Sequence, residues 1–78
     1  MKIQILGSGC PSCQTLEANA KAAVTTAGLE AEVEKVTDMD AITEMGVMLT
    51  PALVIDGVVK TSGKVLNVEE ILTIVQGE

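Results

Sequence analysis

The sequence contains no phenylalanine, tyrosine, tryptophan, histidine or arginine. Without aromatic rings, the core must be built from valine, isoleucine, leucine, alanine and methionine, and the stacking platforms that bind single-stranded nucleic acid are missing. Five lysines stand against eleven acidic residues, and the resulting net charge of −6 repels phosphate backbones and anionic membrane surfaces. We therefore expect neither nucleic acid nor a membrane as a partner.

Long hydrophobic runs are also absent. The longest, Ala52 to Ile55, is far shorter than the roughly 18 residues of a membrane-spanning helix. The apolar stretch after Lys2 is too short for a secretory signal, so we expect a cytoplasmic protein. With 78 residues, of which 47% are hydrophobic, the chain is expected to form one small domain over residues 1–78.

Cysteine is scarce. The chain has two, Cys10 and Cys13, with Pro11 and Ser12 between them and Gly9 before them. In a reducing cytoplasm, such a C-x-x-C pair is more typical of redox catalysis or metal binding than of a structural disulfide. The pair could supply two of the four ligands of a zinc ion, but only a dimer could complete that site, because the chain has no histidine and no second cysteine pair. Two packed thiols without any chemistry are a third interpretation, because free cysteine is common in cores.

Sequence patterns place this pair between a strand and a helix. Lys2–Leu6 alternates as a short strand, and apolar residues recur at helical spacing from Pro11 until Gly28, which suits a helix C-terminus. Pro11 fits the first helical position, where its missing N–H costs nothing. Cys10 is then the N-cap of this helix, and Cys13 lies within its first turn.

The middle of the chain predicts another strand and another helix. Glu32–Val36 is the strand, although its alternation is imperfect. Thr37 or Asp38 can cap a short helix that runs through Met45, with Met39 and Ile42 facing inward.

The last part of the chain predicts a hairpin and a third helix. The apolar run Ala52–Ile55 suits a central strand, and Asp56-Gly57 is a strong signal for a tight turn into an edge strand at Val58–Lys60. Asn67–Glu70 resembles a capping box that opens a helix closed by Gly77. The inward positions of this helix are Val68, Ile71, Leu72 and Val75.

The predicted order is β-α-β-α-β-β-α, an α/β architecture. The first two strands, joined through a helix, should be parallel, and the last two should pair as a hairpin. We expect a four-stranded mixed sheet with helices on both faces.

The predicted position of the cysteines makes the two thiols unequal. Main-chain N–H groups at the helix N-terminus can donate to the Cys10 sulfur and lower its pKa, whereas Cys13 is expected to be more buried. Cys10 would then attack a substrate disulfide, and Cys13 would resolve the mixed disulfide.

A second motif stands before the apolar strand. Pro51 cannot donate to a sheet ladder, so Thr50-Pro51 fits a cis peptide bond at the entry to that strand. A C-x-x-C between the first strand and first helix, followed by this Thr-Pro, resembles the thioredoxin superfamily over essentially the whole chain. The sequence is most similar to the small, aromatic-poor redox-active disulfide proteins of archaea and bacteria.

The resemblance implies a thioredoxin-like fold and a protein dithiol–disulfide oxidoreductase. Its substrates would be disulfide-bearing proteins and its electron donor a disulfide reductase, and we expect a monomer without cofactor or metal. Carried over from the family, Pro51 faces the pair Cys10 and Cys13, and the main chain of Thr50 docks an extended substrate segment. Gly9, Pro11 and Ser12 complete the active-site loop.

The sequence departs from the family at three places. Gly9 stands where thioredoxins have a tryptophan, and Gln4 stands where they have a buried aspartate that aids proton transfer. The segment Lys60–Lys64 has a single glycine and no aspartate, so it lacks the turn with which glutaredoxins hold glutathione. A glutathione-dependent glutaredoxin is therefore an alternative, but not the favoured one.

Two other functions compete with an oxidoreductase. A copper or soft-metal chaperone also carries C-x-x-C between its first strand and first helix, but it usually has methionine where this chain has Ser8, and it has no role for Thr50-Pro51. A non-catalytic interaction domain that kept the fold is the third possibility.

Overall fold

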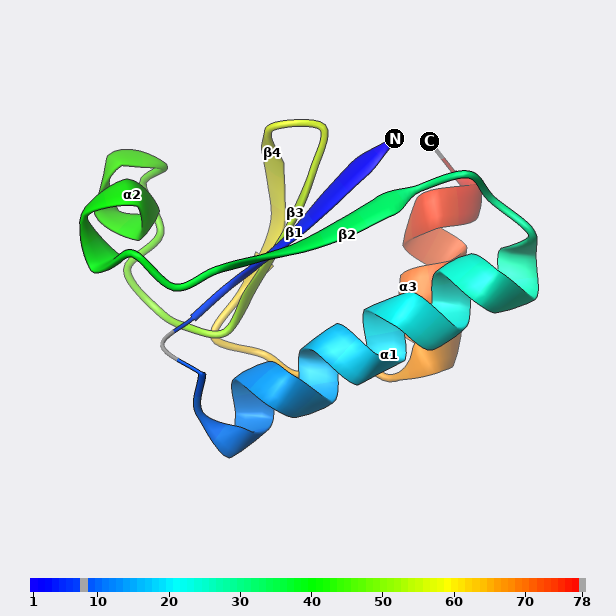
Figure 1. Ribbon diagram of the computed structural model, residues 1–78, viewed down its shortest axis with the longest axis horizontal. Helices are drawn as coiled ribbons and strands as arrows, with labels where there is room; N and C mark the ends of the chain where they lie inside the picture. The colour runs from blue at the N-terminus through cyan, green and yellow to red at the C-terminus, as the bar shows by residue number, and fades with distance from the viewer. Residues whose placement is uncertain (8, 78) are drawn as a thin grey trace.

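The structure is a computed structural model that describes residues 1–7 and 9–77. Its order is the predicted β-α-β-α-β-β-α (Figure 1). The elements are β1 (Lys2–Leu6), α1 (Pro11–Ala27), β2 (Glu32–Val36), α2 (Met39–Glu44), β3 (Ala52–Ile55), β4 (Val58–Ser62) and α3 (Val68–Gln76).

The strands form one mixed sheet in the order β2-β1-β3-β4. β1 is parallel to β2 and antiparallel to β3, and β3 pairs with β4 as a hairpin, as the sequence predicts. Asp56 and Gly57 both have positive φ, 49° and 84°, which is the conformation of a tight hairpin turn. β4 continues to Ser62, two residues beyond the predicted edge strand.

Helices cover both faces of this sheet, which confirms the predicted layers. α1 and α3 lie side by side on one face, and α2 lies apart from them (Figure 1). The larger core fills the space under α1 and α3 and contains Ile3, Ile5, Leu16, Ala20, Ala23, Leu53, Ile55, Leu66, Ile71 and Val75. The smaller core, under α2, contains Leu6, Ile42, Val47, Ala52 and Val54. Alternation along β1 and β3 sends successive side chains into different cores.

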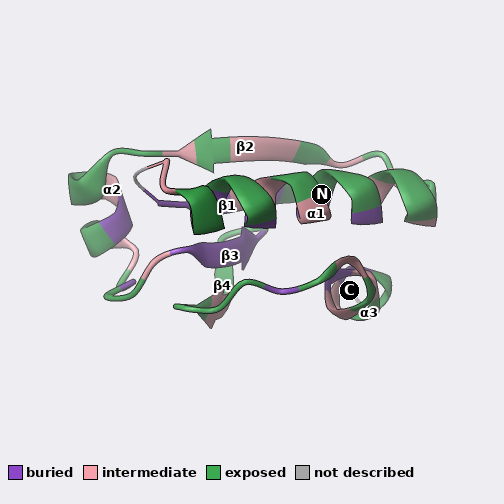
Figure 2. Cartoon of the chain, turned by 90° about the horizontal axis from the view of Figure 1, so that it is seen from below, coloured by how far each residue is buried: buried purple, intermediate pink, exposed green. Residues whose placement is uncertain are grey.

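β3 is an inner strand of the sheet and the most buried of the four. All four of its residues are buried, whereas the edge strands β2 and β4 contain only half-buried and exposed residues (Figure 2). This difference explains why β3 is apolar throughout, since both of its faces are covered.

The helices begin and end where local signals indicate. Cys10 is the N-cap of α1, and Gly28 ends that helix with a left-handed φ of 67°. Asn67 and Glu70 form the predicted capping box of α3. Among the described residues, no helix is long and apolar enough to cross a membrane.

One predicted inward position is wrong. Met39 is 52% exposed, and only Ile42 of α2 is buried. α2 is six residues long, less than two turns, so it presents a single position to the sheet. Met39 faces a surface pocket instead, which is described below.

Candidate active site

The segment between β1 and α1 is held at both of its ends. At the end of β1, the Gly7 N–H donates to the Val36 carbonyl at 3.0 Å, which extends the contact with β2. Gly9 turns the chain with a positive φ of 87°, and Pro11 then starts the helix. The side-chain amide of Gln14 donates to the Gly9 carbonyl at 3.0 Å and ties the loop back to α1. Sequence reasoning did not identify Gln14.

Both cysteines lie at the helix N-terminus with free thiols. The Cys10 sulfur accepts a hydrogen bond from the Cys13 main-chain N–H at 3.3 Å, which is the N-cap interaction. Cys10 is half-buried, whereas Cys13 is only 2% exposed. One sulfur therefore meets solvent, and the other lies in the body of the protein.

The two thiols have pKa values shifted in opposite directions. The Cys13 thiol, followed by the Cys13 main-chain N–H, lowers the pKa of Cys10 because both donate to its sulfur. Burial, followed by the contact with the Cys10 sulfur, raises the pKa of Cys13. The predicted asymmetry is present, but its largest cause at Cys10 is the neighbouring thiol rather than the main chain of the helix.

The two residues between the cysteines are exposed. Pro11 occupies the first helical turn, and its carbonyl accepts from the Thr15 hydroxyl at 3.0 Å. The main-chain N–H of Ser12 contributes to lowering the pKa of Cys10.

The Thr50–Pro51 segment comes close to Cys13 beside Gly7. Its peptide bond is cis, Pro51 is buried, and the Pro51 carbonyl accepts from the Gly63 N–H at 2.9 Å. Pro51 Cα lies 3.9 Å from the point where a Cβ on Gly7 would stand, a point that the sulfur of Cys13 overlaps. The fold therefore brings Pro51 and Cys13 together around Gly7.

The main chain before Pro51 is open for pairing. In the part of the chain that the structure describes, the N–H and C=O groups of residues 48–50 have no hydrogen-bond partner. Met48 and Leu49 are 93% and 63% exposed, which is high for large apolar side chains. This segment therefore presents unpaired main-chain groups and an apolar surface to solvent.

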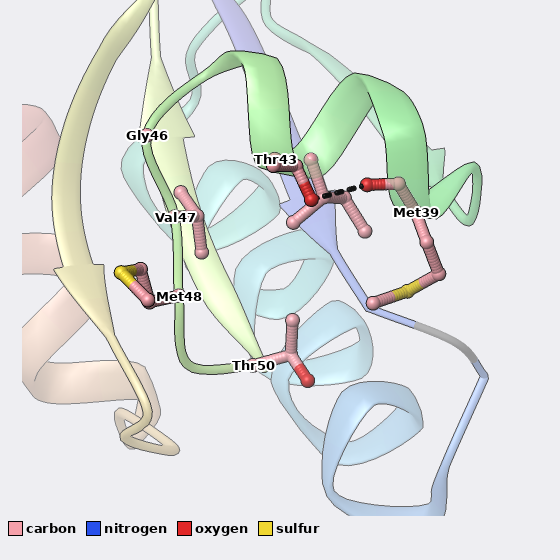
Figure 3. Close-up of a pocket in the computed structure, with 7 residues that line it drawn as sticks. Met39, Thr43, Gly46, Val47, Met48 and Thr50 are labelled. Atoms are coloured by element: carbon pink, nitrogen blue, oxygen red, sulfur yellow. Dashed lines mark hydrogen bonds between the residues drawn. The ribbon is translucent and has the colours of Figure 1, made fainter.

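A pocket of about 330 Å³ lies beside Thr50, between α2 and residues 46–50 (Figure 3). Met39 reaches from α2 toward the same space as Thr50 in that view. Neither cysteine lines the pocket, so it does not contain the thiols. Its lining residues are Met39, Ile42, Thr43, Gly46, Val47, Met48 and Thr50.

Two glycines at the site were missed by sequence reasoning. A Cβ on Gly7 would overlap the sulfur of Cys13, and a Cβ on Gly63 would lie 2.9 Å from the Leu49 Cβ. Gly7 directly follows β1 and Gly63 directly follows β4, and the sequence pattern indicates only that a strand ends there. Nothing local in the sequence shows which side chain comes close to them.

Position 4 supplies no carboxylate, and the described residues form no metal-binding cluster. Gln4, at the place of the family's buried aspartate, is half-buried on β1 opposite Val54. Within residues 1–7 and 9–77, no three His, Cys, Asp or Glu side chains gather where they could hold a metal ion.

Comparison with known proteins agrees with this geometry. A family model described as the thioredoxin domain matches residues 1–76. A thioredoxin of Methanothermobacter thermautotrophicus is 51% identical over 71 residues, which are 91% of this chain and 92% of the relative. A thioredoxin of Methanocaldococcus jannaschii is 45% identical over 69 residues, 88% of this chain and 79% of the relative. The chain therefore belongs to the thioredoxin family and is a thiol–disulfide oxidoreductase.

Proposed function

We propose that this protein reduces disulfides in other proteins, with Cys10 as the nucleophile and Cys13 as the resolving thiol. The observation that carries the proposal is the pairing of a half-buried N-cap sulfur with a buried thiol three residues later, joined by the 3.3 Å hydrogen bond from the Cys13 N–H. The lowered pKa of Cys10 and the raised pKa of Cys13 support the same assignment, because the thiolate is the attacking species.

The reaction consists of two exchanges. The Cys10 thiolate attacks one sulfur of a substrate disulfide, the substrate S–S bond breaks, and the other substrate sulfur leaves as a thiolate. Cys13 then gives up its proton and attacks the Cys10 sulfur, and the second substrate sulfur leaves. The substrate gains two electrons, and the protein ends with a Cys10–Cys13 disulfide. A disulfide reductase would return two electrons and restore the dithiol.

Residues 48–50 would bind the substrate chain, and Thr50 would make the contact nearest to Pro51. Their main-chain groups lack partners among the described residues, so an extended segment can pair with them by strand addition. The exposed side chains of Met48 and Leu49 would cover apolar side chains of that segment. Pro51 would hold this surface against the thiols. The protein would act as a monomer in the cytoplasm, and these surfaces require no second copy.

Reduction of insulin disulfides with a dithiol donor tests the proposal. We expect turnover by the native protein, no turnover by Cys10→Ser, and a trapped mixed disulfide in Cys13→Ser, detected by mass spectrometry. A Cys10→Ser variant that retains activity would contradict the assignment of the nucleophile.

The same preparation distinguishes the metal-chaperone alternative. An oxidoreductase should turn over repeatedly in the presence of a copper chelator. Tight one-to-one binding of Cu(I), without any insulin reduction, would instead support a thiolate metal carrier.

A further inference from the structure

Gly7 lies in direct contact with the buried thiol. A Cβ built on Gly7 would overlap the Cys13 sulfur and would lie 3.1 Å from the Cys13 Cβ. The φ of Gly7 is not in the left-handed region that favours glycine, since it is not among the positive-φ glycines. Any residue could therefore adopt the backbone conformation of Gly7. A side chain at this position is excluded only by the Cys13 sulfur, which fills the space beside it.

We propose that Gly7 is a positioning residue for the resolving step: the missing side chain leaves the space in which the Cys13 sulfur rests against Gly7, ready to attack Cys10. This inference rests on the proposed function, because it concerns the second exchange. Gly7 itself touches no substrate and transfers no proton.

Neither neighbour can move aside easily. The Gly7 main chain is fixed by its N–H bond to the Val36 carbonyl at 3.0 Å, directly after Leu6 pairs with both adjacent strands. The Cys13 main chain is fixed in the first turn of α1, where its N–H donates to the Cys10 sulfur. A methyl group at position 7 would therefore drive the sulfur into another staggered rotamer rather than shift the backbone.

Displacing the sulfur should act mainly on the second exchange. Attack on the mixed disulfide needs the Cys13 sulfur in line with the Cys10 sulfur, whereas the first exchange feels Cys13 only indirectly, through its hydrogen bond to the Cys10 sulfur and the pKa of Cys10. Gly7→Ala should thus separate the two steps, which a general loss of structure would not do.

A chromogenic aryl disulfide reports both steps in one stopped-flow trace. The first aryl thiolate is released when Cys10 attacks, and the second when Cys13 resolves the mixed disulfide. We expect Gly7→Ala to slow the second phase relative to the first by about tenfold or more. Gly77→Ala is the matched control, because the φ of Gly77 is −85° and a Cβ there meets only ordinary contacts at 3.4 and 3.6 Å.

The outcomes separate this inference from the proposed function. A native protein that releases a single equivalent would contradict the resolving role of Cys13, and with it both proposals. A native protein that releases two equivalents, together with a Gly7→Ala variant whose phase ratio is unchanged or faster, would overturn the role of Gly7 alone.

A double-variant cycle tests the contact without any substrate. In the reduced protein, Gly7→Ala should lower the urea midpoint, and the same change made in Cys13→Ala should lower it far less, because the overlapping sulfur is gone. If Gly7→Ala does not fold, folding of the double variant supports the contact. Equal losses in both backgrounds would overturn it.

Discussion

At the scale of single residues, the chemistry depends on how differently two nearby thiols are surrounded. Cys10 ends the loop and is half-buried, while Cys13 is buried within the first turn of α1. The buried thiol does two things at once, since its position raises its own pKa and its hydrogen bond to the Cys10 sulfur lowers that of Cys10. The buried thiol therefore prepares its neighbour for attack while it stays protonated itself.

This coupling predicts the pH dependence of Cys10 reactivity. The Cys13 thiol is the largest cause of the lowered pKa of Cys10, so Cys13→Ala should raise that pKa toward its ordinary value. A higher pKa leaves less thiolate at neutral pH, so alkylation of Cys10 by iodoacetamide should slow at pH 7 and its midpoint should move to higher pH. The measurement is the alkylation rate as a function of pH.

Cys13→Ser is the control, because its hydroxyl can still donate to the sulfur. Its alkylation midpoint should lie between those of the native protein and Cys13→Ala. If the alanine variant kept the native midpoint, the main-chain N–H groups of the helix would set the pKa instead.

Residues differ in how far the sequence reveals their place. Cys10 as N-cap follows from Pro11, because that preference is local. The role of Gly7 depends on a sulfur six positions later, so no pattern near Gly7 indicates it. Met39 has the spacing of a core residue, yet it lines a surface pocket because α2 is too short to bury it.

At the scale of elements, helix ends are the best predicted features, because capping uses neighbouring residues only. The Asn67 side chain accepts from the Glu70 N–H at 2.8 Å, and the Glu70 carboxylate accepts from the Asn67 N–H at 3.1 Å. The Asn67 main chain, followed by Lys64, lowers the pKa of Glu70. The end of β4 is less predictable, since pairing with β3 carries it on to Ser62.

The cap of α3 predicts a measurable loss of stability. Asn67→Ala leaves the Glu70 N–H without its acceptor, so the free energy of unfolding should fall by about 1 kcal/mol. Urea denaturation of the reduced protein measures this loss of unfolding free energy. Asn67→Asp should keep most of the stability because its carboxylate also accepts this bond. An alanine variant as stable as the native protein would mean that water replaces the cap without cost.

At the scale of the whole molecule, the sheet separates two cores with different neighbours. The larger core joins α1 and α3 to the sheet, and the smaller core joins α2 to it beside residues 46–50. The order of elements and the hairpin are predictable, because turn signals and periodicity define them. The pocket is not, because its shape depends on how α2 and residues 46–50 pack beside the sheet, which no sequence pattern indicates.

This division predicts that the two cores affect function differently. Ile42 anchors α2, accepts the Val47 N–H through its carbonyl at 3.3 Å, and lines the pocket, whereas Ile71 anchors α3 on the opposite face. Both side chains are at most 1% exposed, so Ile42→Ala and Ile71→Ala should each cost about 2–5 kcal/mol of unfolding free energy. Stability alone would not distinguish them.

Substrate docking should distinguish them. Ile42→Ala loosens the support of residues 46–50, so the KM for insulin should rise several-fold, while Ile71→Ala should leave KM near its native value. Cys10 alkylation should be unchanged in both, because neither residue donates a hydrogen bond or brings a charge to the thiols. The assays should be run at a temperature at which circular dichroism shows that both variants are folded. Equal rises in KM would mean that docking senses the stability of the whole sheet, and the smaller core would then have no separate role in holding the substrate surface.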